Sequence, residues 1–522
     1  MKRIIIFISF ISIFLLPSCD ILDLSPIDYF ASGNFFNNTA QVNGNMLSLH
    51  NDMRNMHFSI IRLGEIRGGT FVTVTSSLSG NITDSSPFKD NSFTKDLTGI
   101  TNWNGYYSPI MKVNHFIEQV ENGCTFLSST DRGYFLGQAY GIRAYYYFML
   151  YRTYGGVPII ERVEVLNGVT SASDLYNPRS TAKQTLDFIK SDILKSDQYF
   201  ASDFTVKSNA LWSKGATLML KSEIYLWSAK VTDGDQSPAS SDLQTAKDAL
   251  TQLTGRYSLL EKFSDLYEYT NKENNETIFA IRFIDGEATS YDMEFFYFAN
   301  SQFDNIYYGR NGKLMGDTLD LRNAHPGTHL HEYKYELFER YEPDDSRKDA
   351  TFLEVLGHDD DHNIIKKFVI IRKAVGIINN NGNRVFVSDI LVFRYAETLL
   401  MLAEVENKLG NDPSPYINQV RQRAYGADYN PEIHSYSNSD FATNELAILY
   451  ERDIEFVCEG KRWFDIRRMQ DASGRPLVFS SAASYGTTAP VLDYATEAHK
   501  VLWPVDVNVM VNDPTIEQTP GY

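Results

Sequence analysis

Residues 143–158 read RAYYYFMLYRTYGGVP, and this stretch closes a longer apolar segment that decides how the chain folds. Between residues 131 and 154, apolar side chains recur at helical spacing and small residues form a second stripe. The first stripe comprises Phe135, Ala139, Ile142, Tyr146 and Met149, and the small-residue stripe comprises Gly137, Gly141 and Ala144. Because the segment is apolar nearly all round, we expect an interior helix that another helix approaches closely, ending at Gly155 to Pro158.

Further helices follow from the same kind of periodicity. They are predicted at residues 181–197, 210–229, 243–253, 388–409, 415–424 and 444–469, and a strand is predicted at residues 276–283. Paired helices with small residues at their crossings indicate a TPR-like α-solenoid, although no clean repeat of about 34 residues is present. Residues 255–388 are rich in Gly, Asn and Asp and predict long loops. The expected fold class is mainly α, with a TPR-like scaffold of helical pairs packed against a loop-rich half with few short strands.

Composition narrows the range of partners. The 522 residues carry a formal net charge of -18, and such a field repels phosphate backbones and anionic lipid surfaces, so no nucleic acid is expected as a partner. The three cysteines, Cys19, Cys124 and Cys458, are too few for a disulfide framework. Nothing local requires Cys124 and Cys458 to pair, so a disulfide and two small buried thiols both remain open.

The N-terminus has the pattern of an export signal. Lys2 and Arg3 precede an apolar stretch at residues 4–16 that is too short to span a membrane comfortably. The following Leu-Pro-Ser-Cys, ending at Cys19, resembles a bacterial lipobox, in which the cysteine is diacylated and begins the mature chain. The alternative is an ordinary secretory signal with an incidental cysteine. We expect residues 1–18 to be a lipoprotein signal peptide and Cys19 to anchor the protein to a membrane.

Five motifs in chain order resemble the SusD/RagB family of nutrient-binding lipoproteins. They lie at residues 103–114, 143–158, 393–404, 451–465 and 503–522. The chain departs from the family ending at Asp506, where a second Pro is usual, and at Thr519, where Asn is usual. The resemblance covers essentially the whole chain after residue 18. It implies a SusD-like N-terminal region with TPR-like helices at residues 19–232 and a loop-rich RagB/SusD C-terminal region with further helices at residues 233–522.

The resemblance also implies a function. Proteins of this family bind a nutrient, often a glycan or oligosaccharide, at the surface of the cell outer membrane and deliver it to a SusC-like TonB-dependent transporter, over which they close like a lid. Peptide or other nutrient capture by the same architecture remains an alternative. The family resemblance implies a binding protein and not an enzyme. A surface glycoside hydrolase is a further alternative, which would need two carboxylates at a fixed separation.

No cofactor and no metal are expected. The sequence contains no phosphate loop, nucleophile elbow or dinucleotide fingerprint. The run His-Asp-Asp-Asp-His at residues 358–362 has metal-binding side chains, but we interpret it as a solvated acidic turn. In and just after the 451–465 motif, charged residues three apart suggest helical ion pairs with a structural role: Arg452 with Glu455, Glu459 with Arg462, and Asp465 with Arg468.

The ligand must therefore be held by the more variable segments. The first candidate is the aromatic-rich segment after the predicted strand, where sugars would find flat faces beside amides and charged groups. Its predicted ligand-binding residues are Tyr291, Phe295, Tyr297, Asn305, Tyr307 and Tyr308. The alternative for this segment is a buried hairpin with an aromatic core. The second candidate is residues 67–93, with Arg67 and Asp84, for which the alternative is an ordinary surface loop.

Overall fold

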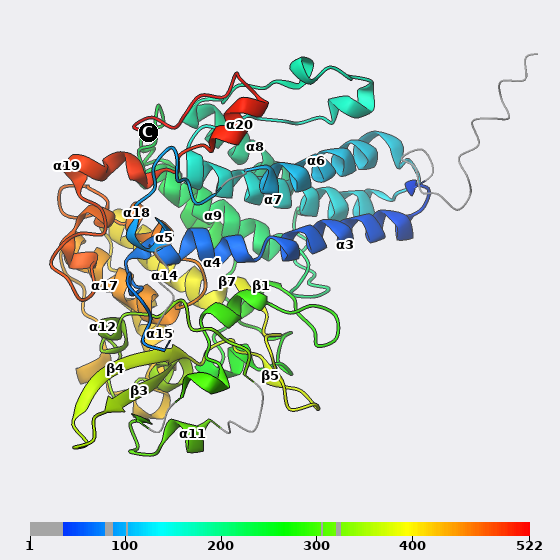
Figure 1. Cartoon of the computed structure of the whole chain (residues 1–522). Coiled ribbons are helices and arrows are strands. Elements are labelled where there is room, and N and C mark those ends of the chain that lie inside the picture. Colours follow the sequence, from blue (N-terminus) through cyan, green and yellow to red (C-terminus); the bar gives the residue numbers. More distant parts are fainter. Residues whose placement is uncertain (1–34, 79–86, 101–102, 304–305, 320–324) are drawn as a thin grey trace, which may run out of the picture.

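The computed structural model describes residues 35–78, 87–100, 103–303, 306–319 and 325–522 (Figure 1). Long helices form one half of the molecule, and the strands with their long loops form the other. The helices of seven or more residues are α3 (Thr39–Asn55), α4 (Phe58–Gly64), α6 (Asn104–Glu118), α7 (Ser129–Tyr154), α8 (Ala182–Phe200), α9 (Lys214–Lys230), α10 (Asp242–Thr251), α14 (Tyr395–Lys408), α15 (Ser414–Tyr425), α17 (Phe441–Glu455) and α18 (Arg462–Arg468). The mainly α architecture is confirmed.

Helix α7 lies at the centre of the helical half. The side chain of Ser128 accepts a hydrogen bond from the backbone N–H of Asp131 at its start, and Gly155, with a φ of 75°, ends it. Every residue from 135 to 154 is buried, because α6 and α8 pack against it on either side. The interior helix predicted at residues 131–154 is therefore confirmed.

The small residues of α7 allow a close approach to its neighbours. A Cβ atom at Gly141 would lie 2.1 Å from Nε1 of Trp212, which itself donates to Oγ1 of Thr217 in α9 at 2.9 Å. A Cβ atom at Gly137 would lie 2.8 Å from the ring of Phe200 at the end of α8. Because these rings occupy the space where a side chain would stand, only glycine fits at the two positions.

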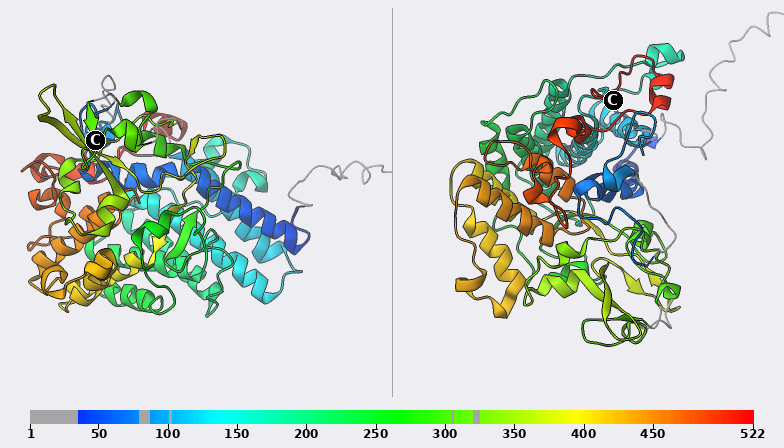
Figure 2. Two further views of the ribbon diagram at one scale, coloured as in Figure 1. Left: turned by 90° about the horizontal axis from the view of Figure 1, so that it is seen from below. Right: turned by 60° about the vertical axis from the view of Figure 1, so that its left-hand side comes forward.

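Successive helices pack against one another along the chain. Contacts link α7 with α8, α8 with α9, and α9 with α10, and then α10 with α14, which also packs against α15 and α17. Figure 2 shows from two further sides that the blue and cyan helices α3, α6 and α7 run together and that the yellow and orange helices α14, α15 and α17 lie on the other side of the scaffold. The helices predicted at residues 181–197, 210–229, 243–253 and 415–424 correspond to α8, α9, α10 and α15.

The helix predicted at residues 388–409 is wrong at its start. Strand β7 (Ile390–Arg394) comes first, and α14 begins only at Tyr395. Strand β7 pairs antiparallel with β1 (Thr277–Ile281), which confirms the strand predicted at residues 276–283. A helical period is present in the sequence of 390–394, but pairing with a distant strand supplies the backbone partners and overrides it.

The single helix predicted at residues 444–469 is also wrong, because α17 ends at Glu455 and α18 begins at Arg462. Between them Cys458 and Gly460 have positive φ values of 61° and 71°. A Cβ atom at Gly460 would lie 2.5 Å from the carbonyl oxygen of Ile60 in α4. The backbone of the turn approaches α4 this closely because glycine has no side chain to obstruct it.

This break rearranges the ion pairs expected in the motif. Asp465 and Arg468 pair at 2.9 Å as predicted. Arg452 pairs with Asp465 at 2.8 Å and not with Glu455, while Glu455 pairs with Arg394 at 2.6 Å. The predicted partners were wrong because the two helices place these side chains against other elements.

Glu459 and Arg462, the third predicted pair, also contact other residues instead of each other. Glu459 contacts Arg394 at 2.8 Å, and Arg462 contacts Asp453 at 2.6 Å. Arg394 further contacts Glu276 beside β1 at 3.0 Å. These side chains are buried, so the network joins α17, β1 and β7 and supports the structural role that the sequence suggested.

The loop-rich half contains two further small sheets. Strands β2 (Tyr307–Tyr308), β3 (Phe352–His358) and β4 (Ile364–Ile371) form an antiparallel sheet in that order, and β5 (Ile377–Ile378) pairs with β6 (Arg384–Val385). The acidic run joins β3 to β4, and Asp359 Oδ1 accepts hydrogen bonds from the backbone N–H groups of Asp361 and Asn363. The run is therefore a tight turn held by its own first aspartate.

Shorter helical turns connect these elements. They are η2 (Ile66–Gly68), α5 (Pro87–Asp90), the π-helix η3 (Gln119–Gly123), η4 (Glu164–Asn167), η5 (Ala172–Leu175), η6 (Phe263–Tyr267), η7 (Tyr291–Phe295), η8 (Asn300–Gln302), α11 (Met315–Thr318), α12 (Tyr335–Phe338), α13 (Ser346–Thr351), η9 (Gly426–Asp428), α16 (Pro431–His434), η10 (Leu477–Phe479), η11 (Ser481–Ala483), α19 (Tyr494–Glu497), η12 (Ala498–Val501) and α20 (Val507–Asn512). Cys124 and Cys458 are free and buried. None of the helices in the described ranges is long and apolar enough to cross a membrane.

Candidate functional site

Three predicted functional residues lie outside the described part of the chain: Cys19, Asp84 and Asn305. Their roles stay predictions. The six other predicted ligand-binding residues are distributed between the interior, the β2–β3–β4 sheet and the surface beside α4.

Arg67 lies in the protein interior, so its predicted contact with a ligand is wrong. Its side chain has no exposed surface. The centre of its guanidinium group lies 3.9 Å from the ring centroid of Trp463 and 4.4 Å from that of Trp503, and Nε donates to Oδ1 of Asn91 at 2.8 Å. The cation packs α18 against the C-terminal segment.

Two of the predicted aromatic residues face inward. Tyr297 is 5% exposed, with ring centroids 4.4 Å from Phe298 and 6.0 Å from Phe386. Phe295 is half-buried, and its ring lies 5.9 Å from that of His331. For Tyr297 the alternative of an aromatic core is therefore correct, and this ring is not available to a ligand.

Tyr307 and Tyr308 form strand β2 and are half-buried. The ring of Tyr308 stacks on the imidazole of His358, with centroids 4.6 Å apart and planes 20° from parallel. Tyr307 meets Phe368 edge to face at 5.6 Å. Each ring already has a partner within the sheet, so only part of its surface faces outward.

Tyr291, the first residue of η7, is 51% exposed and is the most accessible of the described aromatic residues in the candidate set. The edge of its ring meets the imidazole of His57, with centroids 5.5 Å apart and planes at 84°. Burial raises the pKa of the Tyr291 phenol; the neighbouring Asp292 adds to this rise, and Arg62 opposes it. The phenol therefore stays neutral and keeps both a donor and an acceptor for a ligand.

The C-terminal end of α3, which lies just before His57 in the chain, carries charged and amide side chains. Arg54 Nη1 contacts Oε1 of Glu287 at 2.6 Å, and Nη2 donates to Oδ1 of Asn51 at 2.8 Å. His57 Nε2 lies 3.1 Å from Oδ2 of the buried Asp292. An exposed ring beside amide, guanidinium and carboxylate groups can stack on a sugar and bind its hydroxyl groups.

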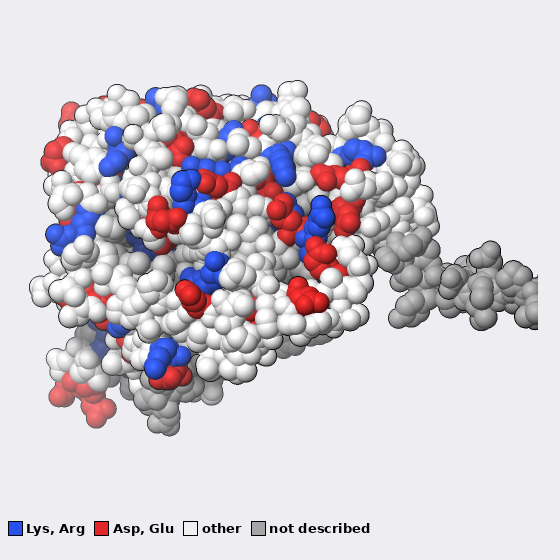
Figure 3. Space-filling view, turned by 90° about the horizontal axis from the view of Figure 1, so that it is seen from above, with Lys and Arg blue, Asp and Glu red and all other residues white. Residues whose placement is uncertain are grey.

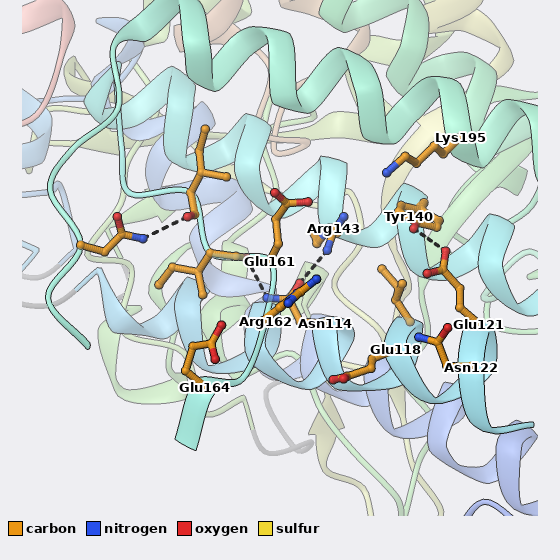
Figure 4. A pocket seen from close by; sticks show the side chains of 14 residues that line it. Asn114, Glu118, Glu121, Asn122, Tyr140, Arg143, Glu161, Arg162, Glu164 and Lys195 are labelled. Carbon is orange, nitrogen blue, oxygen red and sulfur yellow. Dashed lines mark hydrogen bonds between the residues drawn. The ribbon is translucent and has the colours of Figure 1, made fainter. Parts of the chain in front are cut away.

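A separate hollow of about 730 Å³ lies between α6, η3, α7, α8 and residues 159–164 (Figure 4). It is lined mainly by polar and charged side chains. They are Asn114 and Glu118 of α6, Glu121 and Asn122 of η3, Tyr140 and Arg143 of α7, Lys195 of α8, and Glu161, Arg162, Glu164 and Asn177 of the connecting segment, together with Ile117, Ile159 and Ile160.

Hydrogen bonds hold the floor of this hollow in place. Arg143 Nε and Nη2 donate to the two carboxylate oxygens of Asp192 at 2.7 and 2.8 Å, and Nη1 donates to Oδ1 of Asn114 at 2.8 Å. Asn114 Nδ2 in turn donates to the carbonyl oxygen of Ile160 at 2.7 Å. Burial raises the pKa of Asp192, against the opposing effect of Arg143. The network joins three helices to the segment that forms one wall.

Sequence reasoning missed this hollow. Asn114 and Arg143 fall within two of the five family motifs, and both serve the scaffold. The remaining wall residues, such as Glu118, Glu161 and Lys195, come from separate elements. No local pattern connects them, because only the packing of α6, α7 and α8 brings them to one place.

Comparison with known proteins identifies the family. Residues 356–522 match the SusD family, and residues 40–226 match the family described as starch-binding and associating with the outer membrane. A crystal structure of a SusD superfamily protein from Bacteroides fragilis NCTC 9343 is 37% identical, covers 92% of this chain and 99% of its own, and superposes with a TM-score of 0.86. The chain belongs to the SusD superfamily.

Other members of the SusD superfamily agree with this assignment. NanU of B. fragilis is 31% identical, covers 96% of this chain and 100% of its own, and has a TM-score of 0.82. A SusD-like protein of Formosa agariphila is 24% identical over 548 residues, 99% of this chain and 98% of its own. Surface glycan-binding protein A from Bacteroides thetaiotaomicron, in complex with laminarihexaose, is 17% identical, covers 92% of this chain and 99% of its own, and has a TM-score of 0.65, so it shares the SusD fold.

Proposed function

We propose that this SusD superfamily protein binds a glycan at the cell surface and passes it unchanged to a SusC-like TonB-dependent transporter, with Cys19 as its lipid anchor in the outer membrane. The observation that carries the proposal is Tyr291, whose exposed ring lies beside a helix end bearing amide and charged groups. A family match described as starch-binding and outer-membrane-associated supports it, as does a protein of the same fold in complex with laminarihexaose.

Binding at this surface would combine stacking with hydrogen bonds. One face of a pyranose ring packs on the exposed phenol of Tyr291, because the apolar C–H groups of a sugar gather on its faces. The Arg54–Glu287 pair has side chains 23% and 51% exposed, and an exposed pair of this kind contributes little to stability. Its two members can therefore turn to sugar hydroxyl groups at low cost, as can the Asn51 amide.

Calorimetric titration with a panel of oligosaccharides tests this surface. Tyr291→Ala should weaken binding about tenfold, which corresponds to about 1.4 kcal/mol of lost stacking. Tyr494→Ala is the matched control, since Tyr494 is 55% exposed on α19. Wild-type affinity in Tyr291→Ala would refute the proposed surface. Release of new reducing ends would refute a non-catalytic role, and binding of peptides without glycans would favour the alternative ligand.

The anchor and the transporter need separate measurements. Cells expressing the full chain and labelled with palmitate should yield a labelled membrane protein, and Cys19→Ser should abolish the label and release the chain from the membrane. A TonB-dependent transporter should co-purify with the wild-type protein after mild detergent extraction. Unchanged labelling of Cys19→Ser would contradict the anchor, and a purified protein free of any such transporter would contradict the partnership.

A further inference from the structure

The hollow of Figure 4 has a polar lining, and it shares no lining residue with the Tyr291 surface. Its volume of about 730 Å³ falls within the range of roughly 300–1,000 Å³ that is usual for small-molecule sites. Figure 4 shows Lys195 reaching in from α8, Glu121 and Asn122 from η3, and Glu161 from the connecting segment. Groups from five elements therefore converge on one space.

The floor of the hollow is preorganised. Asn114 and Arg143 are held by the hydrogen bonds to Asp192 and Ile160, and the hydroxyl group of Tyr147 accepts a hydrogen bond from the backbone N–H of Ile160 at 2.8 Å. A ligand that enters does not have to order these groups, so little conformational entropy is lost on binding.

The wall residues, in contrast, have unused binding capacity. Within the described ranges, no ion pair is formed by Glu118, Glu161, Glu164, Arg162 or Lys195. Lys195 Nζ lies 4.8 Å from the ring centroid of Tyr140, and Glu121 Oε1 accepts the Tyr140 hydroxyl at 2.7 Å. Carboxylates that accept and cations and amides that donate, placed around one space, match the alternating donors and acceptors of vicinal hydroxyl groups.

The charges that line the hollow determine which hydroxylated ligands it favours. Four glutamates and three basic residues line the hollow, but Arg143 is already neutralised by the buried Asp192. The two remaining cations are outnumbered by four carboxylates. Acidic and basic side chains are mixed over the upper face of the molecule in Figure 3, so this local excess is not offset by a large basic area there. The hollow should disfavour uronates, sulfated sugars and phosphates and favour neutral or amine-bearing ones.

Stacking has little part in this site. The ring of Tyr140 is 4% exposed and lies parallel to that of Tyr199, with centroids 5.7 Å apart and planes at 10°. A metal is also a poor occupant, because among the described residues no group of three or more metal-binding side chains is suitably placed. We propose that the hollow between α6, α7 and α8 is a second binding site, specific for a neutral or amine-bearing sugar unit and operating through hydrogen bonds.

This second site would act beside the Tyr291 surface without depending on it. A single glycan chain that contacts both would gain affinity through effective concentration. If the Tyr291 proposal fails, the hollow can still bind a sugar unit, and the reverse also holds, so the two proposals are tested separately.

Saturation-transfer NMR with glucosamine, glucose and glucuronate, each added alone to the mature protein, tests the inference. Wild-type protein should bind glucosamine and glucose, with glucosamine at least about tenfold tighter than glucuronate, because two extra carboxylates act on the ligand charge. Glu118→Gln combined with Glu161→Gln should reduce that preference to less than about threefold. Glu261→Gln combined with Glu268→Gln, at two exposed positions away from the hollow, should leave it unchanged.

Tyr291→Ala separates the two sites. It should leave the preference for glucosamine over glucuronate unchanged, because the carboxylates of the hollow set that preference. The inference is overturned if the Glu118 and Glu161 variant binds all three as the wild type does, or if Tyr291→Ala abolishes the glucosamine signal. A crystal soaked with glucosamine should show the sugar between Glu118 and Glu161, and an empty hollow with the sugar bound elsewhere would also overturn it.

Discussion

Replacing Arg143 by Met should destabilise the helical half, because the change leaves a buried carboxylate without its partner. Arg143 donates to both oxygens of Asp192 at 2.7 and 2.8 Å, and the two side chains are 3% and 1% exposed. Met keeps most of the volume of the side chain but supplies no donor. Asp192 then loses its charge partner, and Oδ1 of Asn114 loses the donor that Arg143 provides.

The magnitude follows from the cost of an unpaired buried charge. Removing one partner of a buried ion pair lowers the free energy of unfolding by about 3–5 kcal/mol, and we expect about 4 kcal/mol here. Removing both, as Arg143→Met with Asp192→Leu, should lower it by less than about 2 kcal/mol, because no buried charge is left behind. The difference between the single and double variants measures the coupling of the pair.

The loss of stability caused by Arg143→Met should also depend on pH. Burial already raises the pKa of Asp192 with Arg143 present, and removing the cation raises it further. In the unfolded chain an aspartate titrates near about 3.9. A folded pKa above the unfolded value means that ionisation opposes folding, so the deficit of Arg143→Met is largest at neutral pH and shrinks as the pH falls towards about 4.

Thermal unfolding followed by near-ultraviolet circular dichroism measures both effects. A chain of about 500 residues unfolds with an entropy of roughly 1 kcal/mol per degree, so a loss of about 4 kcal/mol lowers Tm by about 4 °C. The reasoning is refuted if Arg143→Met melts within about 1 °C of the wild type at pH 7. It is equally refuted if the double variant is less stable than the single one.

Three other predictions concern stability. Gly141→Ala should cost about 2 kcal/mol, because its Cβ would meet Trp212 at 2.1 Å, whereas Gly105→Ala, with open space in α6, should cost nothing in the same melting assay. Burial raises the pKa of Glu65 from 4.5 to about 7, so the contribution of Glu65 to the free energy of unfolding should fall by about 3 kcal/mol as pH rises from 4.5 to 7; in urea titrations the stability of the wild type relative to Glu65→Gln should fall by this amount over that pH range, and a constant difference would contradict this. Arg67→Lys should cost about 2 kcal/mol in urea, because the planar cation between two tryptophan rings is lost; unchanged stability would contradict that role.

Local features decided what could be predicted about the scaffold. The segment at residues 131–154 is apolar on nearly every side, and its cap residues are Ser128 and Gly155, so its helix and its burial follow from the chain alone. The motifs at residues 103–114, 143–158 and 503–522 likewise placed the chain in its family before any contact was known. Interior helices and family motifs depend on residues that are close together in the sequence, so they can be predicted without knowledge of tertiary contacts.

The aromatic segment shows where such reasoning ends. Tyr291, Phe295 and Tyr297 are equally suitable for a sugar by composition, yet Tyr291 is 51% exposed and Tyr297 is 5% exposed. The segment contains 3-10 turns and irregular loops, so no simple period assigns its side chains to one side. Which ring faces outward depends on what packs beneath it, here His57 for the first and Phe298 and Phe386 for the last.

The sequence by itself determined the interior helix, most of the helical scaffold and the family, because periodicity, capping and motifs act within a few turns of chain. Only the tertiary structure decided that residues 390–394 form a strand, that Arg67 is enclosed by Trp463 and Trp503, and that α6, α7 and α8 enclose a polar hollow. Each of these depends on a partner from a distant part of the chain. A backbone hydrogen bond, an aromatic contact or a cavity wall supplied from elsewhere leaves no local pattern from which it could have been predicted.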